Sequence, residues 1–456
     1  MRERIEQALR ESEAEYTEIR IENVISSWVN FRGEDLDTIG SSKTVGGIVR
    51  TLYKGGWGYA IFNDLNDLEK RVREACRSAQ LVGKEQSKFA EVETVVDEIK
   101  ASFGKDFRDI SLSEKKSVIE EYNKIILSYS EKIETSATGY NDTFRKIYYG
   151  NSEGTYIEDE RPDASVSLLA AAREGSNVQR GFESVAGGLG FQIVEGLQEK
   201  AEGAARRAVE LLSAPPVNGG KYAVVINPKL AGVFAHEAFG HLSESDFVYE
   251  NNRMKELMVL GKRMGPDILD IIDDGTMPGL RGTHKYDDEG VKTKKNYLIK
   301  NGILTGRLHS RETAAKMGEQ PTGNARAIDY QYQPIVRMTN TYIDKGKAKF
   351  EDMLRDIKLG LYAVDMVGGQ TSMEMFTFSA AYGYMIRDGK IAELVRDVVL
   401  TGNVFETLMN IDMVGDTVGY PPAGGGCGKD GQSPLPVGFG GPYVRIQNVV
   451  VGGRQQ

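Results

Sequence analysis

The sequence predicts an α+β protein of two domains: a mixed αβ N-terminal domain over residues 1–215 and a largely antiparallel, β-rich C-terminal domain over residues 216–456. Strand-like segments follow one another through short turns and do not alternate regularly with helices, which is typical of antiparallel sheets. The 52 glycines also fit an architecture with many turns. The boundary is expected at 213–220, where two prolines and two glycines separate a predicted helix from a predicted strand, although a loop within one domain is the alternative.

The N-terminal domain is expected to mix helices and strands. Residues 15–33 alternate in polarity like two strands with a turn near Glu22 and Asn23. The glycine-rich segment 44–62 predicts a hairpin or two strands. Apolar periodicity and capping residues predict helices at about 65–82, 111–129 and 197–212, and strands between 132 and 185.

The C-terminal domain opens with a buried strand at 222–226 and a helix from Pro228 to about His241, which Asn227 is suited to cap. Two hairpins follow, with two-residue turns at Asn301-Gly302 and Asp388-Gly389. Further strands are expected at 335–343, 372–380 and 442–451, and short helices at 310–317, 349–358 and 403–409.

Residues 236–241 of this helix read His-Glu-Ala-Phe-Gly-His and hold two of the four histidines in the chain. Two imidazoles can bind a divalent metal, and a neighbouring carboxylate, here Glu237, can take a proton from water. A zinc hydrolase needs this set of residue types. The alternative is coincidence, with His236 on the surface and His241 a cation at a helix C-terminus. The strand, cap and helix around the motif favour metal binding by His236 and His241.

The two histidines stand five residues apart, one more than in the common His-Glu-x-x-His motif. Five steps of an ideal α-helix leave the rings about 140° apart, too far to share one ion. One residue inserted as a π-bulge widens the turn and brings the rings toward the same side. The sequence therefore predicts a distorted helix between Glu237 and His241, with Gly240 as the position where the backbone deforms most easily.

A tetrahedral zinc ion held by two histidines needs a third protein ligand, with water in the fourth position. Of the two cysteines, Cys76 lies on the apolar stripe of a predicted helix and is expected to pack in the core. Cys427 lies in a glycine-rich segment, 421–436, that has neither helical nor strand periodicity, and Lys429 is close by. We expect Cys427 to be the third ligand.

Other interpretations of this position remain open. Cys427 as a buried loop thiol is one, and Cys427 as the nucleophile of a cysteine hydrolase is another. A third is a carboxylate ligand, with Glu244, Asp246 and Glu250 as nearby candidates. Five further side chains are candidate oxyanion or substrate contacts but are more simply explained as structural or solvent-facing: His284, His309, Arg326, Lys429 and Gln432.

Composition and charge limit the class of protein. The chain has 57 basic and 66 acidic residues, a net charge of −9 and no basic tract, which argues against nucleic-acid binding. The chain has no stretch of about 18 apolar residues, so the sequence predicts no transmembrane helix. Its polar start has no apolar signal core. Two cysteines in different contexts do not suggest a disulfide framework, so a cytoplasmic location is expected.

The chain resembles the TldD-type metalloproteases of the TldD/PmbA family, also called modulators of DNA gyrase. The matching segments are HEAFGH at 236–241, KNGILTGRL at 300–308, PTGNARA at 321–327, MNIDMVGDT at 409–417 and GCGKDGQ at 426–432. The resemblance implies zinc bound by His236, His241 and Cys427, with Glu237 catalytic. It also implies a dimer around an enclosed chamber, often with a TldE (PmbA) subunit that lacks the metal motif.

The motif and the resemblance together predict a zinc-dependent metallopeptidase that hydrolyses small or unfolded peptides, as a homodimer or with a TldE/PmbA-like subunit. An extended peptide is expected to add as a strand to a sheet edge near the site, with the loop around Cys427 and the strand 372–380 as walls. Two alternatives belong to other classes. One is a non-catalytic regulatory protein with a structural metal, and the other is a zinc hydrolase of a non-peptide amide.

Overall fold

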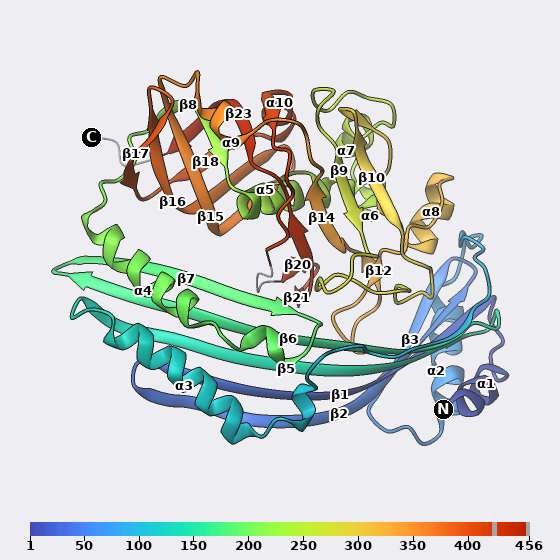
Figure 1. Cartoon of the computed structure of the whole chain (residues 1–456). Coiled ribbons are helices and arrows are strands. Elements are labelled where there is room, and N and C mark those ends of the chain that lie inside the picture. Colours follow the sequence, from blue (N-terminus) through green and yellow to red (C-terminus); the bar gives the residue numbers. More distant parts are fainter. Residues whose placement is uncertain (422–425, 453–456) are drawn as a thin grey trace.

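A computed structural model describes residues 1–421 and 426–452 of the chain (Figure 1). A large curved sheet from the N-terminal part lies at the bottom of the figure, and the C-terminal part lies above it. Helices and strands are mixed throughout, and most paired strands are antiparallel. This arrangement confirms the predicted α+β class.

The N-terminal sheet has seven strands in the order β3-β2-β1-β5-β6-β4, with β7 paired to β6. Its strands are β1 (Tyr16–Arg32), β2 (Asp35–Tyr53), β3 (Gly56–Phe62), β4 (Val96–Ile99), β5 (Ile133–Asn151), β6 (Tyr156–Glu174) and β7 (Asn177–Gly187). Four helices cover one face: α1 (Arg2–Leu9), α2 (Leu68–Val82), α3 (Leu112–Ser128) and α4 (Gln198–Ser213). Short 3₁₀ turns are η1 (Phe107–Asp109) and η2 (Phe191–Val194).

Strand β1 runs without interruption, so the turn predicted near Glu22 and Asn23 is wrong. Side chains alternate between the two faces of a strand. Ile19 and Ile21 therefore pack in the core with α1 and α2. Glu22 is buried and ion-paired with Arg20 at 3.4 Å. Polar residues here face a second layer of protein and do not mark a turn.

The C-terminal part contains two larger sheets. One has the order β15-β8-β23-β18-β16-β17, with β19 paired to β23, and it closes on itself because β15 also pairs with β16. Its strands are β8 (Gly220–Ile226), β15 (Leu359–Ser372), β16 (Met375–Arg387), β17 (Lys390–Val395), β18 (Val399–Asn403), β19 (Ile411–Val414) and β23 (Val444–Gly452). The other has the order β11-β10-β9-β14-β22: β11 (Ile303–Leu304), β10 (Lys295–Lys300), β9 (Ile271–Asp274), β14 (Asn340–Ile343) and β22 (Gly438–Gly440).

Two short ribbons and six helices complete this part. The ribbons pair β12 (Ala325–Arg326) with β13 (Ile335–Val336), and β20 (Cys427–Lys429) with β21 (Gln432–Leu435). The helices are α5 (Pro228–Ala235), α6 (Ser245–Glu250), α7 (Asn252–Leu257), α8 (Arg311–Met317), α9 (Phe350–Leu354) and α10 (Val404–Met409). The hairpin turns predicted at Asn301-Gly302 and Asp388-Gly389 are both confirmed, with positive φ at each residue.

Helix α5 lies between the two larger sheets and packs closely on β22. A Cβ atom on Gly232 would lie 2.4 Å from the backbone nitrogen of Gly440, so only glycine permits this approach. Leu230 and Phe234 of the same helix are buried in the main core of the C-terminal part. The helix that leads into the histidine motif is therefore held on two sides.

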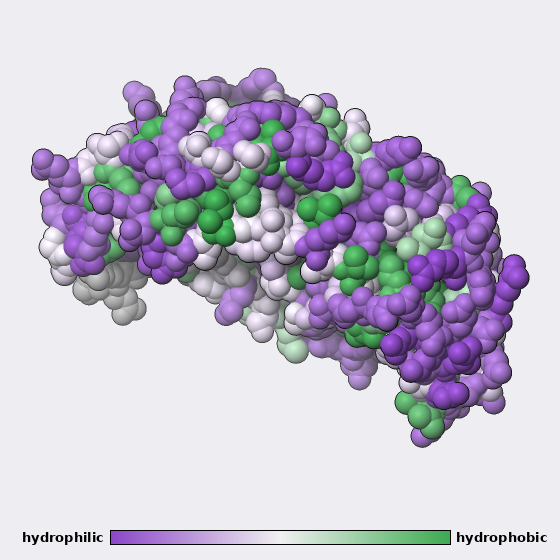
Figure 2. Space-filling model, turned by 90° about the horizontal axis from the view of Figure 1, so that it is seen from below, coloured by the Kyte–Doolittle hydropathy of each residue, from purple (hydrophilic) through white to green (hydrophobic). Residues whose placement is uncertain are grey.

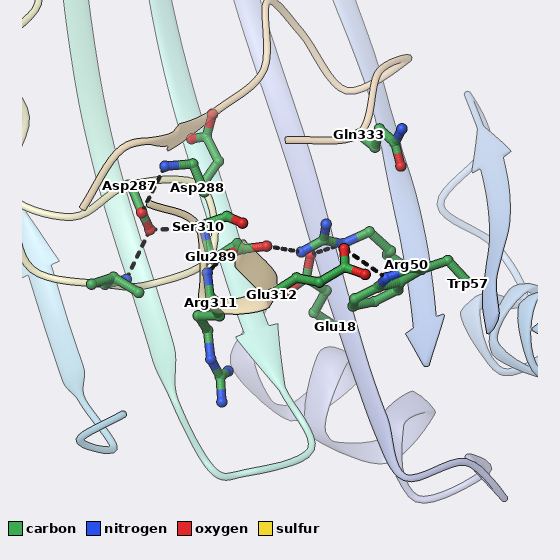
Figure 3. Close-up of polar contacts among 12 residues, drawn as sticks. Glu18, Arg50, Trp57, Asp287, Asp288, Glu289, Ser310, Arg311, Glu312 and Gln333 are labelled. Atoms are coloured by element: carbon green, nitrogen blue, oxygen red, sulfur yellow. Dashed lines mark hydrogen bonds and ion pairs between the residues drawn. The ribbon is translucent and has the colours of Figure 1, made fainter. Parts of the chain in front are cut away.

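Buried ion pairs join the C-terminal part to the N-terminal sheet, and Figure 3 shows Arg50 between Glu18 and Glu289. The distances are 2.7 Å from Arg50 Nε to Glu18 and 2.6 Å from its terminal nitrogen to Glu289. The backbone N–H of Arg311, at the start of α8, donates to Glu289 at 2.8 Å. A charge out of water is tolerated only when it is paired, so these contacts fix the two parts against each other.

Figure 2 views the molecule from below and shows a largely hydrophilic surface on which hydrophobic residues form separate patches. Within residues 1–421 and 426–452, no helix is long and apolar enough to cross a membrane.

Candidate metal centre

The motif helix changes its winding at the histidines. Asn227 caps α5 by accepting a hydrogen bond from the Leu230 N–H at 2.9 Å, as predicted. Residues His236–Gly240 then form a π-helical turn (η3), and His241–Ser243 form a 3₁₀ turn (η4). The wide turn confirms the predicted distortion. It brings the rings of His236 and His241 together, with centroids 5.2 Å apart.

Gly240 fits this turn because it has no side chain. Its φ of −58° and ψ of −51° are ordinary for a right-handed helix, so any residue could adopt them. A Cβ atom at this position would lie 2.0 Å from Sδ of Met338, which is fully buried. The role predicted for Gly240, easy backbone deformation, is therefore wrong, because the turn needs glycine for close packing.

The structure brings His236, His241 and Cys427 together from distant parts of the chain. One ligand atom of each residue lies within 4.8 Å of the other two. Cys427 Sγ is 3.3 Å from His241 Nε2, across a sequence separation of 186 residues. His236 and Cys427 are 4% and 3% exposed. In the described part of the chain, no other group of His, Cys, Asp and Glu side chains is arranged to hold an ion.

A short hairpin carries the cysteine. β20 and β21 pair antiparallel around Asp430 and Gly431, which have φ values of 49° and 76°. The expectation that segment 421–436 lacks strand structure is therefore wrong at Cys427–Lys429 and Gln432–Leu435. Residues 422–425, which belong to the same glycine-rich segment, lie outside the described residues.

Two buried arginines hold this hairpin and the residue that follows it through backbone carbonyls. Arg337 is fully buried and donates to the backbone carbonyls of Cys427 at 2.7 Å and Gln432 at 3.2 Å. Arg326 donates to the Pro436 carbonyl at 2.7 Å. Sequence reasoning missed Arg337, because no local pattern shows that an arginine will bind a carbonyl 90 residues away.

The two imidazoles favour the thiolate form of Cys427. Burial raises the pKa of a thiol, but His236 and His241 outweigh burial and lower the pKa of Cys427 to about 4. The thiolate is the form in which cysteine binds a metal ion. The electrostatics of the site therefore suit a ligand.

Glu237 lies next to His241 and is partly exposed to solvent. Its Oε2 is 4.0 Å from His241 Nε2, and its side chain is 24% exposed. A carboxylate in this position can reach a water molecule next to the ligand atoms and accept its proton.

Glu244, one of the carboxylates considered as a third ligand, lies on the other side of the His241 ring. Its Oε2 is 3.0 Å from Nδ1, whereas Nε2 faces Cys427. Burial raises the pKa of Glu244, but Lys429 and His241 outweigh it and lower the pKa to about 2. Asp246 binds Lys429 at 2.6 Å, and Glu250 is exposed. This arrangement favours Cys427 over the three carboxylates.

The other candidate contacts are held within the fold. His284 and His309 are buried, and His309 Nε2 is 3.1 Å from Ser245 Oγ. Gln432 accepts a hydrogen bond from the Ile328 N–H at 3.0 Å. These contacts, and those of Arg326 and Lys429 above, agree with the structural explanation of each residue. Cys76 lies on α2 and is buried in the core between this helix and the N-terminal sheet, as predicted.

A glutamate beside two histidines and a cysteine, on a distorted helix of an α+β chain, is the residue set of a zinc hydrolase. Three family models match the chain, described as PmbA/TldA metallopeptidase domain 1 at residues 17–79, central domain at 105–213 and C-terminal domain at 219–453. The chain belongs to the PmbA/TldD metallopeptidase family, as the resemblance of its motifs indicated.

Relatives with similar sequences are named as metalloproteases. A metalloprotease of Synechocystis sp. is 45% identical over 444 residues, which cover 97% of this chain and 96% of the relative. A zinc metalloprotease TldD homolog of Saccharolobus solfataricus is 30% identical, covering 96% of this chain and 97% of the relative. The chain is accordingly a metalloprotease of this family.

Solved structures with lower sequence identity share the fold. A putative modulator of DNA gyrase from Thermotoga maritima has a TM-score of 0.77 at 23% identity, covering 96% of both chains. TldE from Thermococcus kodakarensis has a TM-score of 0.77 at 18% identity, covering 99% of this chain and 100% of that one.

Proposed function

We propose that this protein is a zinc-dependent peptidase in which His236, His241 and Cys427 bind the metal and Glu237 is the general base. One observation carries the proposal: three ligand atoms from two distant segments converge within 4.8 Å of one another. The family and the zinc metalloprotease relative support the same reaction class.

The residues of the site suit zinc. Two imidazoles and a thiolate are common zinc ligands, and three protein ligands leave a fourth position for water or substrate, as in catalytic sites. Nδ1 of His236 is buried and has no hydrogen-bond partner among the described residues. A structural zinc site normally has four protein ligands. The set of three therefore favours catalysis over a non-catalytic regulatory protein.

Each side chain has a separate task in peptide hydrolysis. A bound zinc ion would lower the pKa of water and polarise the scissile carbonyl. Glu237 accepts the proton of the attacking water and returns it to the leaving amine. Arg337 keeps the Cys427 hairpin against the histidines through the Cys427 carbonyl.

The substrate is a small or unfolded peptide. An extended peptide would add as a strand to a sheet edge beside the site, with the Cys427 hairpin and residues 372–380 as walls, and main-chain hydrogen bonds would give affinity with little sequence preference. Cleavage would take place in the chamber of a dimer, either with a second copy or with a TldE/PmbA-like subunit. The similarity in fold to a TldE protein supports the second arrangement.

Location and domain division belong to the same proposal. The protein acts in the cytoplasm, where the two free cysteines remain reduced. The domain boundary lies near 213–220, between the end of α4 and the start of β8.

Metal analysis tests the ligand assignment. The purified protein is expected to hold about one zinc ion per chain, and Cys427→Ser is expected to lose zinc far more readily than Cys76→Ser, because Cys76 is packed in the core of α2. Equal zinc retention in the two variants would exclude Cys427 as a ligand.

Peptide digestion tests the reaction and the partner. Glu237→Ala is expected to keep its zinc and lose hydrolysis of unfolded protein, with or without an added TldE-like subunit, and a chelator should stop the wild-type reaction. Small non-peptide amides provide the comparison. Faster cleavage of those amides than of peptides would favour the amide hydrolase.

A further inference from the structure

A buried carboxylate lies behind one of the two motif histidines. Glu244 is 1% exposed, and its Oε2 is 3.0 Å from His241 Nδ1. The opposite ring nitrogen, Nε2, faces Cys427 Sγ at 3.3 Å. When a carboxylate accepts a hydrogen bond from Nδ1–H, the lone pair of the imidazole lies on Nε2, on the side of the metal ligands.

A buried lysine then connects this carboxylate to the cysteine hairpin. Lys429 Nζ is 3.1 Å from Glu244 and 2.6 Å from Asp246, and it donates to the Val336 carbonyl at 2.9 Å. The Val336 N–H donates to Asp246 at 3.3 Å. Lys429 follows Cys427 by two residues on β20. The lysine therefore joins α6, β13 and the strand that carries the third ligand.

No carboxylate in the described part of the chain is hydrogen-bonded to His236 in this way. Its buried Nδ1 is unpaired there, as suits a nitrogen left for the metal. Of the two imidazoles, only the ring of His241 is held by a carboxylate, and that carboxylate is held by the cysteine strand. A displacement of the Cys427 hairpin would therefore also displace the His241 ring, through the Lys429–Glu244 and Glu244–His241 contacts.

We propose that Glu244 and Lys429 are positioning residues: Glu244 fixes the His241 ring with Nε2 toward the metal, and Lys429 locks Glu244 to the Cys427 strand so that helix and hairpin close as a unit. This inference rests on the proposed function. It assigns roles to two residues outside the ligand set and gives the lysine of GCGKDGQ a physical purpose.

Zinc affinity measured by chelator competition, starting from metal-free protein, tests the role of Glu244. Glu244→Gln keeps the size of the side chain and loses its charge, and it is expected to bind zinc about 10- to 100-fold more weakly, as for other residues that support a ligand histidine. Glu244→Ala should be weaker still. Glu250→Gln is the matched control, because Glu250 is an exposed carboxylate at the end of α6, the helix that Glu244 precedes as its N-cap residue, and the zinc affinity of this variant should equal that of the wild type.

A second control separates positioning from general stability. The control is Ile119→Val. Ile119 is a buried residue of α3 in the N-terminal core, far from the motif in sequence. This variant should lower the thermal midpoint of the metal-free protein and leave zinc affinity unchanged. If Ile119→Val lost as much zinc affinity as Glu244→Gln for the same drop in thermal midpoint, the positioning role would be rejected.

Hydrogen exchange of the metal-free protein tests whether Lys429 holds the Cys427 hairpin against Glu244. Lys429→Met removes the cation and keeps an apolar chain of similar length. The amides of residues 427–435 are expected to exchange faster in this variant than in the wild type, with weaker zinc binding. Unchanged exchange in this hairpin would overturn the role of Lys429.

The two proposals fail in different ways. If wild-type protein and Cys427→Ser bind zinc equally well, the ligand assignment itself fails. If Cys427→Ser loses zinc while Glu244→Gln binds it as tightly as the wild type does, the ligands stand and only the positioning role of Glu244 is excluded.

Discussion

The π turn has no room for a side chain at position 240. Because an added Cβ atom would lie 2.0 Å from Met338 Sδ, Gly240→Ala should force this buried methionine or the turn to shift. Overpacking of this kind costs about 1–3 kcal/mol. We expect chemical denaturation to show that loss of stability, together with weaker zinc retention.

The Gly240→Ala/Met338→Ala double variant checks this cause. It relieves the contact, so it should recover part of the zinc retention lost in Gly240→Ala, although the smaller side chain leaves a cavity. No recovery would mean that the turn depends on Gly240 for another reason.

Gly203 offers the opposite case. It lies inside α4, and the nearest atom to an added Cβ is a terminal nitrogen of Arg206 at 4.0 Å. Glycine in a helix interior is less stable than alanine by about 0.5–1 kcal/mol. Gly203→Ala should therefore raise the denaturation midpoint without changing zinc content, and a lower midpoint would contradict the open space seen here.

The convergence of His236, His241 and Cys427 was predictable from the sequence, whereas the residues that support them were not. His236, Glu237 and His241 stand in one motif, and Cys427 is one of only two cysteines. Arg337 gave no such signal, because its partners are backbone carbonyls that become neighbours only after folding. Residues with rare chemistry can be found locally, but residues that hold them require the tertiary contacts.

The hairpin of β20 and β21 depends on a turn with two positive φ values, at Asp430 and Gly431. No atom lies within 4 Å of a Cβ added to Gly431, so Gly431→Ala would suffer from backbone strain alone. That strain costs roughly 1–2 kcal/mol. We expect Gly431→Ala to release zinc faster in a chelator assay, and Gly431→Asn, which tolerates this conformation, to be milder.

Element predictions succeeded where flanking segments were long enough to show a period. The Asp388-Gly389 turn joins β16 and β17, which are 13 and 6 residues long. Asp430-Gly431 carries the same two-residue signal, but it was overlooked because its strands are only three and four residues long. The turn expected near Glu22 and Asn23 is the opposite error, because a buried Glu22 that pairs with Arg20 inside a long strand looks like a turn residue when only the local sequence is read.

Buried ion pairs connect the N-terminal sheet to the C-terminal part. Asp288 is ion-paired with Arg20 at 3.1 Å and Arg161 at 3.0 Å. Asp288→Asn leaves both cations without this partner, and breaking a buried pair costs about 3–5 kcal/mol. Denaturant unfolding should show a loss of this size, and a loss below about 1 kcal/mol, as for an exposed pair, would contradict the burial.

The same ion pairs predict how stability changes with pH. Burial raises the pKa of Asp288, but Arg161 and Arg20 outweigh burial and hold the pKa well below its usual range. A carboxyl whose pKa is lowered by folding stabilises the protein above its unfolded pKa of about 3.9, and this contribution is lost as the pH falls below that value. The difference in unfolding free energy between wild type and Asp288→Asn should therefore shrink as acid is added, and a constant difference would exclude the ion pair as its cause.

None of these pairings was predictable, because each joins residues far apart in the chain. The separation between Arg161 and Asp288 is 127 residues. Local periodicity gives the number and type of many elements, but it does not indicate which buried charge will meet which. The expected boundary near 213–220 stays a prediction for the same reason, and limited proteolysis at that segment would test it.

The spacing of the ligands has a consequence for how the protein is made. His236 and His241 leave the ribosome 186 residues before the sulfur that completes the set, counted from His241. Under the proposed ligand set, a nascent or truncated chain that stops short of Cys427 holds only two of the three ligands, and we infer that it cannot cut its neighbours. Synthesis itself would thus delay the hydrolytic activity until Cys427 has emerged.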